Sequence, residues 1–416
     1  MAAYGFHGGL QLDKHTRDVI ARPIQDAAPS AVLALSLLQH RDLRLHACVR
    51  IGDSVHAGQV VARPDLDIGD NRLGAWLHAP CDGEIIGIES RPLIQQPKRS
   101  GPHLLLRVRE SAPVATRQLD ALSTAELLPA MLAQAGLSGL GGANFPSADK
   151  LIHRVDTLIL NGAECEPWIA CDEGLLIESA ALVLEGAQVL ARACAAQRIE
   201  LALESHMARA IDAVQAVLHE CIADDAVPVR LHCLPSRYPQ GSARQLIEAL
   251  TGRQVPLGQH SAAVGVVVHN VGTAHATALA SRGQALTHRI VTVSGPGVHA
   301  PGNYRVALGS SVADLVASAG GYPEQARRML IGVALPHDDF ALQKGSNCVL
   351  VLDAVRTPQA EVTPACIRCG DCADVCPARL SPHLLWQSAQ AQRAERARAD
   401  GVMACIECGL CDLVCP

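Results

Sequence analysis

The chain has 416 residues, of which 49% are hydrophobic and 18% are charged. This length fits about two to four domains, and this composition excludes a disordered chain and a charged helical rod. The 35 basic and 41 acidic residues give a formal net charge of −6 without a basic block, so we expect no nucleic-acid partner. Apolar runs such as residues 31–35 and 264–268 are far shorter than the roughly 18 residues of a membrane-spanning helix. We therefore expect no transmembrane segment, and residues 1–12 lack the pattern of a secretory signal.

The N-terminal stretch, up to about Glu110, contains short β-branched runs that Gly and Asp interrupt, as at residues 49–60 and 79–85. This pattern predicts a compact β barrel or sandwich, and it is similar to biotinyl and lipoyl carrier domains. A carrier needs an attachment lysine at an exposed hairpin, and the expected tip at residues 69–76 has none. We therefore expect a structural or docking role for this domain.

Helix-like and strand-like segments alternate from about Leu119 to Arg289, which predicts a layered α/β domain. Residues 208–221 carry their apolar side chains on one helical face. Short apolar runs suited to buried parallel strands lie at residues 157–160, 199–203, 227–231 and 264–268.

A glycine-rich segment occupies residues 136–146, and Lys150 follows it. Glycines let backbone amides approach a phosphate or a flat ring, and a nearby lysine can meet the phosphate charge. The preceding residues 125–135 are typical of a helix and not of a strand, so the context of a Rossmann dinucleotide fingerprint is missing. On its residues alone, the segment is as compatible with a plain loop as with a phosphate site.

The segment Asn161-Gly-Ala-Glu164-Cys-Glu166-Pro follows a predicted strand directly. Ligands of α/β sheets bind at the carboxyl ends of strands, where Asn161, Glu164 and Glu166 could form hydrogen bonds to a ligand. A solvated turn is the simpler interpretation of these residues taken alone. Asp172 and Glu173 are expected to begin the next helix, where their charge suits its dipole.

Beyond Arg289 the sequence predicts a strand at residues 290–294, a helix at 312–319 and a strand at 349–352. A linker with Pro and Thr follows at residues 356–364.

Eight of the sixteen cysteines lie beyond residue 365 and form two copies of C-x2-C-x2-C-x3-C-P. They are Cys366, Cys369, Cys372 and Cys376 in the first copy, and Cys405, Cys408, Cys411 and Cys415 in the second. This run holds [4Fe–4S] clusters in two-cluster ferredoxins, where the fourth cysteine of each motif binds the other cluster. On that rule Cys415 completes cluster one and Cys376 completes cluster two.

A pair of four-cysteine zinc sites is the weaker alternative, because such sites use paired CxxC units. Between the motifs, Ser381 and Pro382 are expected to begin one helix that Gly401 ends. The other cysteines have no ligand spacing and are expected to be buried apolar residues.

Together with residues 237–241 (RYPQG) and 270–273 (NVGT), these motifs resemble the RnfC component of the Rnf ion-translocating electron-transport complex. The central domain is similar to the flavin-binding subunit of respiratory complex I. The order of motifs, beginning with FHGG at residues 6–9, covers nearly the whole chain.

The resemblance implies a multidomain α/β protein of four parts. They are an N-terminal β barrel-sandwich hybrid at residues 1–115, a complex-I-flavin-subunit-like FMN/NADH domain at 116–288, a soluble-ligand-binding β-grasp domain at 289–355, and a two-[4Fe–4S] ferredoxin-type domain at 363–416.

The resemblance also implies residues for FMN and NADH. The FMN phosphate would lie against Gly139, Gly141, Gly142 and Lys150. Asn161, Asn270 and Thr273 would contact the flavin or its phosphate. Phe145, Glu164 and Glu166 would face the nicotinamide dinucleotide.

The sequence departs from the family pattern at two places. Asn144 stands where a glycine is usual, and Ser242 and Ala243 replace Gly-Glu after the YPQG segment. Asn tolerates a left-handed backbone, so the glycine loop is expected to keep its form. Ala243 removes a carboxylate that could contact a nucleotide.

The function implied is that of an electron-input subunit of a translocase, an NADH-linked iron–sulfur flavoprotein that connects NADH, FMN and two [4Fe–4S] clusters. The expected location is peripheral, at the cytoplasmic face of the inner membrane. The expected partners are the other subunits of a membrane Rnf-type complex, and ferredoxin or another redox protein. Two alternatives remain, namely a flavin-less iron–sulfur relay or docking subunit, and a cobalamin reductase with a similar domain order.

Overall fold

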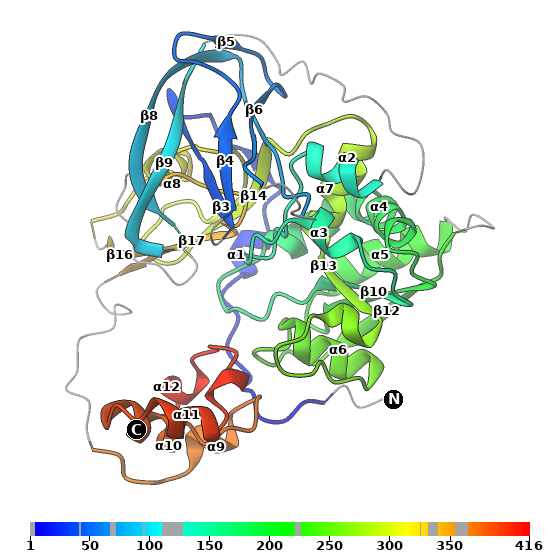
Figure 1. Cartoon of the computed structure of the whole chain (residues 1–416), viewed down its shortest axis with the longest axis vertical. Helices are drawn as coiled ribbons and strands as arrows, with labels where there is room; N and C mark the ends of the chain where they lie inside the picture. Colours follow the sequence, from blue (N-terminus) through cyan, green and yellow to red (C-terminus); the bar gives the residue numbers. More distant parts are fainter. Residues whose placement is uncertain are drawn as a thin grey trace.

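The computed structural model describes most of the chain, arranged as a β domain, an α/β domain, a second β-rich module and a small helical domain (Figure 1). The described residues are 5–40, 43–66, 72–94, 96–109, 128–220, 226–324, 326–331, 340–353 and 365–416.

The N-terminal domain consists of two four-stranded sheets, which confirms the predicted barrel-sandwich hybrid. One sheet has the order β2 (Val32–Ser36), β9 (Gln96–Val108), β8 (Gly83–Leu93), β5 (Ser54–Val55), and the other β3 (Leu38–His40), β4 (Leu43–Ala47), β6 (Val60–Pro64), β7 (Leu77–His78). Alternate residues of β2 and β9, such as Leu33, Leu104 and Leu106, are fully buried between the sheets. The expected carrier tip falls partly on residues 67–71, which lie outside the described residues. Its described part contacts the next domain, because Leu73 N–H donates to Asp149 Oδ1 over 2.6 Å.

The central domain has a parallel sheet in the order β12 (Val229–Leu234), β11 (Arg198–Glu204), β10 (Thr157–Gly162), β13 (Val266–Asn270). All four strands were predicted, but β12 and β13 begin two residues later than expected. At β13 the reason is a 3-10 turn at Ser261–Val264, which holds the first apolar residue outside the sheet. The helices are α2 (Leu128–Gln134), α3 (Ser147–Leu151), α4 (Cys171–Ala193), α5 (Ala208–Glu220), α6 (Ala243–Thr251) and α7 (Val271–Ser281).

The longest helix, α4, has 23 residues and a mean hydropathy of 1.5 over its apolar window, which satisfies the length and composition of a membrane span. In the structure 61% of that window is buried, and α4 packs against α5 and α7. Gly186 is required at the α7 contact, because a Cβ there would lie 1.7 Å from the Ala274 carbonyl oxygen. These contacts make α4 a core helix of the described fold.

The third module is a five-stranded sheet in the order β1 (Gln25–Asp26), β15 (Gly302–Ala307), β14 (His288–Ser294), β17 (Cys348–Asp353), β16 (Ala326–Ile331), with α8 (Val312–Ser318) packed on it. The predicted strands and helix of this region are confirmed. Strand β1 comes from the N-terminal segment, just after α1 (Arg17–Ile20), and adds a parallel edge to this sheet.

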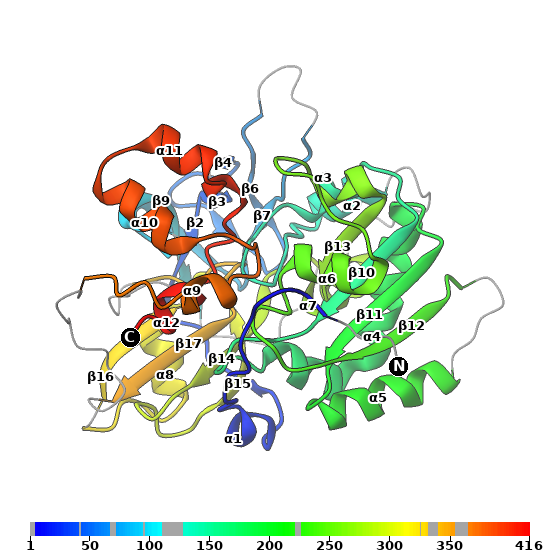
Figure 2. The same cartoon turned by 90° about the horizontal axis from the view of Figure 1, so that it is seen from below.

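The C-terminal domain contains α9 (Asp371–Asp374), α10 (Pro382–Gln390), α11 (Ala394–Ala399), a 3-10 turn (Val402–Ala404) and α12 (Leu410–Leu413). The prediction of one helix from Ser381 to Gly401 is wrong, because Gln392 has a φ of 55° and separates α10 from α11. The domain lies beside the central domain, with the N-terminal segment between them (Figures 1 and 2).

Candidate functional site

The two cysteine loops of the C-terminal domain have the same backbone form. Arg368 and Glu407, at equivalent positions, have φ values of 59° and 58°, and Gly370 and Gly409 that follow have φ values of 96° and 75°. A Cβ at either glycine would meet nothing within 4 Å, so the space beside each glycine is open. Open space beside a glycine suits a [4Fe–4S] cube, whose sulfides need close approach of the chain.

One contact between the two cysteine motifs agrees with the crossed ligand rule for cluster two. Burial raises the pKa of Cys408, and the charges of Cys376 and Cys405 raise it further. Cys376, from the first motif, therefore lies with the cysteines of the second motif. Cys376 is buried, whereas Cys366, Cys369, Cys405 and Cys415 are exposed, and none of the eight forms a disulfide.

The glycine loop is closed on itself by two backbone hydrogen bonds. Gly139 N–H donates to the Phe145 carbonyl over 2.7 Å, and Asn144 N–H donates to the Gly139 carbonyl over 3.1 Å. Asn144 has a φ of 51°, so asparagine does adopt the left-handed conformation that the departure from glycine requires. At Gly139 and Gly141 an added Cβ would meet no atom closer than 3.4 Å. Packing within the protein therefore leaves room for a methyl group at both positions, so the fold itself does not require glycine there.

Other residues predicted for FMN lie in the surrounding scaffold. The Lys150 amine donates to the Val268 carbonyl over 3.1 Å and lies 5.8 Å from the Phe145 ring centroid. Burial lowers the pKa of Lys150 to about 8. Thr273 is fully buried, and its hydroxyl accepts the Leu140 N–H over 3.0 Å. In this structure Lys150 and Thr273 thus hold the loop and β13 in place.

Asn161 and Asn270 lie at the carboxyl ends of β10 and β13, as predicted. Asn161 Nδ2 donates to the Gly241 carbonyl over 2.9 Å, which ties β10 to the YPQG segment. Asn270 caps α7, because its Oδ1 accepts the Gly272 N–H over 2.8 Å. Both asparagines therefore have fixed orientations at one edge of the sheet.

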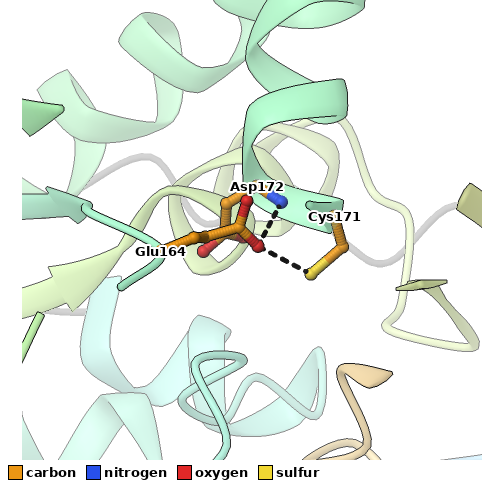
Figure 3. Close-up of side chains that lie close together, drawn as sticks. All are labelled: Glu164, Cys171 and Asp172. Carbon is orange, nitrogen blue, oxygen red and sulfur yellow. Dashed lines mark hydrogen bonds between the residues drawn. The ribbon is translucent and has the colours of Figure 1, made fainter. Parts of the chain in front are cut away.

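Glu164 caps the N-terminus of α4, a role that the sequence did not predict (Figure 3). Its two carboxylate oxygens accept the N–H groups of Asp172 and Glu173, each over 2.9 Å, and Cys171 Sγ lies 3.3 Å from one of them. Burial raises the pKa of Glu164 to about 7, although both backbone bonds lower it. Burial and the Glu164 charge raise the pKa of Asp172 well above its usual value, and Asn270 donates to the Asp172 carboxylate.

Glu166, in contrast, is exposed. The Cys165 thiol beside it is buried, and burial raises its pKa well above the usual value. Cys165 is therefore a poor nucleophile, and Glu166 is the carboxylate of this segment that is free to face a ligand.

A cavity of about 200 Å3 brings several distant segments together. The predicted ligand residues that line it are Gly141, Asn161, Glu164, Glu166 and Asn270. Gly139, Gly142, Phe145, Lys150 and Thr273 do not line it. Tyr238, Gly241 and Ser242 form another part of the wall, and Ile406, Glu407 and Cys408 of the second cluster loop complete it. The Tyr238 hydroxyl donates to the Cys408 carbonyl over 2.9 Å, so the cluster loop is bonded to the cavity wall.

Family models match the four parts of the chain in order. An RnfC barrel sandwich hybrid domain matches residues 4–102, a Nuo51 FMN-binding domain 132–278, an SLBB domain 290–336, and a 4Fe-4S dicluster domain 360–416. The RnfC protein of Rhodobacter capsulatus, part of its ion-translocating oxidoreductase complex, is 34% identical over 97% of this chain and 78% of that protein. The chain belongs to this family. The resemblance inferred from the motifs is thereby confirmed, together with the predicted fold of each domain.

Other members of the RnfC family are longer than this chain. The RnfC protein of Pseudomonas aeruginosa is 37% identical over 96% of this chain, and the chain spans 52% of it. Among solved structures, an NAD+-reducing [NiFe]-hydrogenase in the H2-reduced state aligns over 56% of this chain and 47% of its own, at 23% identity and a TM-score of 0.46.

Two residues of this RnfC-family protein that sequence analysis did not assign contact the site. Lys14 donates to the Glu164 carbonyl and pairs with Glu204 over 2.9 Å. Asp172 lines the cavity and was expected only to begin α4. Lys14 and Glu164 are 150 residues apart in the chain, so no local sequence pattern could reveal their contact.

The scattered cysteines are only partly as expected. Cys165, Cys171, Cys194 and Cys348 are buried, but Cys48 and Cys233 are exposed, so the expectation is wrong for these two. Cys233 is exposed because it follows the buried His232 in β12, where successive side chains alternate between faces. Cys221 lies outside the described residues.

Proposed function

We propose that this RnfC-family protein passes electrons between NADH, FMN and two [4Fe–4S] clusters. Its coarser role, an electron-transfer subunit of an ion-translocating oxidoreductase with FMN-binding and 4Fe-4S domains, follows from its family and domains. The observation that carries the finer proposal is the cavity that Asn161, Glu166 and Asn270 share with Cys408. A ligand bound there would touch both the predicted flavin residues and a predicted ligand of cluster two.

Each group of residues has a distinct part in this proposal. The open backbone at Gly139 and Gly141 would admit the FMN. Asn161 and Asn270, held by their own hydrogen bonds, would orient it, and the exposed Glu166 would face the nicotinamide dinucleotide. When bound, FMN supplies the exchange between two-electron and one-electron transfer that a nicotinamide and a [4Fe–4S] cluster require.

The remaining predicted ligands are proposed on the same basis. Gly142, Lys150 and Thr273 would serve the FMN phosphate side, Phe145 and Glu164 the dinucleotide side, and the eight C-terminal cysteines the two clusters. The proposed boundaries of the four domains are residues 1–115, 116–288, 289–355 and 363–416. We also propose a peripheral position at the cytoplasmic face of the inner membrane, with membrane subunits and ferredoxin or another redox protein as partners.

A flavin-less relay subunit is the second candidate, and two observations favour it. The cavity of about 200 Å3 is smaller than the roughly 300–1,000 Å3 of typical small-molecule sites. Ala243, the first residue of α6, supplies no carboxylate beside it. In a relay subunit the C-terminal domain alone would carry electrons.

The test uses the whole chain, purified without oxygen and incubated with FMN. The proposal expects FMN in the denatured supernatant and bleaching of the cluster absorbance by NADH. Dithionite serves as the control, since it reduces clusters without a flavin. Bleaching by dithionite but not by NADH, with no FMN retained, would establish the relay function instead. Zinc in place of iron would refute both.

A further inference from the structure

The N-terminal segment, residues 6–14, joins the C-terminal domain to the cavity wall, and we call it the strap. The dark blue trace passes between the red domain and the green domain in both views (Figures 1 and 2). On the C-terminal side, Gly9 N–H donates to the Val375 carbonyl over 2.8 Å. Val375 directly precedes Cys376, so the strap is bonded next to a proposed ligand of cluster two.

On the other side, the strap is bonded to the YPQG segment. Leu10 and Tyr238 exchange two backbone hydrogen bonds, of 3.0 and 2.7 Å. Phe6 is buried, with 7% of its surface exposed, and the Arg237 guanidinium lies 5.3 Å from its ring centroid. Tyr238 in turn donates to the Cys408 carbonyl. The strap therefore bonds the first cluster motif directly at Val375 and is linked to the second motif through Tyr238.

The far end of the strap reaches the cavity itself. The Lys14 amine donates to the Glu164 carbonyl, and it forms an ion pair with the buried Glu204 over 2.9 Å. This one short stretch thus contacts the residue before Cys376, the YPQG segment and the segment that carries Glu164 and Glu166.

The two glycines of the strap are needed for this path. Gly8 and Gly9 have φ values of 69° and 79°, which only glycine adopts readily. A Cβ at Gly8 would lie 2.4 Å from the Val375 oxygen, and one at Gly9 would lie 2.8 Å from the Tyr238 oxygen. Both obstacles are backbone atoms, which cannot move aside as a flexible side chain can. The FHGG motif is thus explained by contacts that cross between domains.

We infer that the strap is a positioning element that fixes cluster two against the cavity and so sets the rate of electron transfer between them. The inference rests on the proposed function for its electron donor, but its contacts do not depend on FMN. The proposed ligands of cluster two lie in a small domain that contacts the cavity wall directly through the bond from Tyr238 to Cys408, and the strap adds bonds to both sides of this contact.

The test compares Gly8→Ala with Gly5→Ala, because a Cβ at Gly5 would meet nothing within 4 Å. Phe6→Ala is a second variant that loosens the strap without straining its backbone. We expect Gly8→Ala and Phe6→Ala to keep their iron and sulfide content and their reduction by dithionite. NADH-dependent cluster reduction should be slower in both variants than in the unaltered protein, because electron transfer weakens as cluster two moves away from the cavity. Gly5→Ala should match the unaltered protein.

Hydrogen exchange supplies a readout that needs no flavin. Amides of residues 237–241 and 404–411 should exchange faster in Gly8→Ala and Phe6→Ala, and not in Gly5→Ala. If the unaltered protein is not reduced by NADH, the proposed function fails and the exchange result alone decides on the strap. Equal exchange in all variants would overturn the inference. Lost clusters with an unchanged rate per intact molecule would also overturn it, since that result indicates only structural support.

Discussion

Replacing Gly141 by alanine tests whether this glycine is needed for FMN binding or for the stability of the fold. Its φ is not positive, and an added Cβ would lie 3.4 Å from Asn270, which is an ordinary contact. Alanine also reduces the freedom of the unfolded chain. We therefore expect Gly141→Ala to leave stability unchanged or to raise it by about 0.4–1 kcal/mol.

The same substitution should weaken the binding of FMN. If the flavin approaches the backbone at Gly141, the added methyl group occupies part of its space. Forcing a methyl into a well-packed contact costs roughly 1–3 kcal/mol. Since about 1.4 kcal/mol corresponds to tenfold in affinity, FMN should bind roughly 5- to 150-fold more weakly.

The assay is titration of the reconstituted chain with FMN, followed by quenching of flavin fluorescence, with thermal unfolding measured in parallel. Gly87→Ala is the matched control, because its Cβ would meet only Leu105 Cδ1 at 4.0 Å in the N-terminal domain. Gly186→Ala should instead lower stability sharply, because of the contact with Ala274. Unchanged FMN affinity in Gly141→Ala would refute the assignment of this glycine to the ligand. A loss of stability matching that of Gly186→Ala would refute the interpretation that the fold has room for a methyl group at Gly141.

Three further predictions concern charge and ligation. The pKa of Glu164 is raised to about 7 from 4.5, so the folded protein binds the extra proton and loses stability as the pH rises from 4.5 to 7. Glu164→Gln should flatten this slope by up to about 3 kcal/mol in unfolding measured against pH, and an unchanged slope would contradict the assignment. Cys376→Ser should remove roughly half of the bound iron by weakening cluster two, while the exposed Cys233→Ser keeps all of it; equal iron in both variants would exclude Cys376 as a ligand. Ala243→Glu should tighten NADH binding about 2- to 10-fold by restoring a hydrogen-bonding carboxylate at the N-terminus of α6, as measured by equilibrium titration; unchanged binding would count against this position.

The parts of the fold that could be predicted are those determined by patterns of residues close together in the sequence. Short apolar runs identified the strands of the central sheet, because the inner strands β10 and β11 are buried on both faces. The two cluster loops were predicted from the spacing of their cysteines alone. The matching φ values at equivalent positions show that the two loops have the same backbone form. The helix between them was wrongly extended, since helix propensity cannot reveal the single left-handed residue at Gln392.

The site was predicted in its residue types more than in its arrangement. Glu164 lines the cavity, and its oxygens also accept N–H groups eight and nine residues further along the chain, a contact that no pattern predicted. Lys150 was expected to meet a phosphate, but its amine binds a carbonyl of β13. Both results depend on how α4 and β13 pack against neighbouring segments, and sequence patterns contain only local spacing.

The cavity wall also bears on how the two clusters divide their tasks under the proposed function. Cys408 of the second motif lines the cavity, and Cys376 of the first motif is close enough to Cys408 for its charge to raise the pKa of Cys408. Cys366, Cys369 and Cys415, three of the four ligands proposed for cluster one, are exposed and do not line it. If the proposed function holds, cluster two would be the neighbour of the flavin, and cluster one would face outward, where a redox partner could approach it. The strap contacts the residue before Cys376, a proposed ligand of cluster two. It would therefore affect electron transfer between the flavin and cluster two, and not the transfer between cluster one and a redox partner.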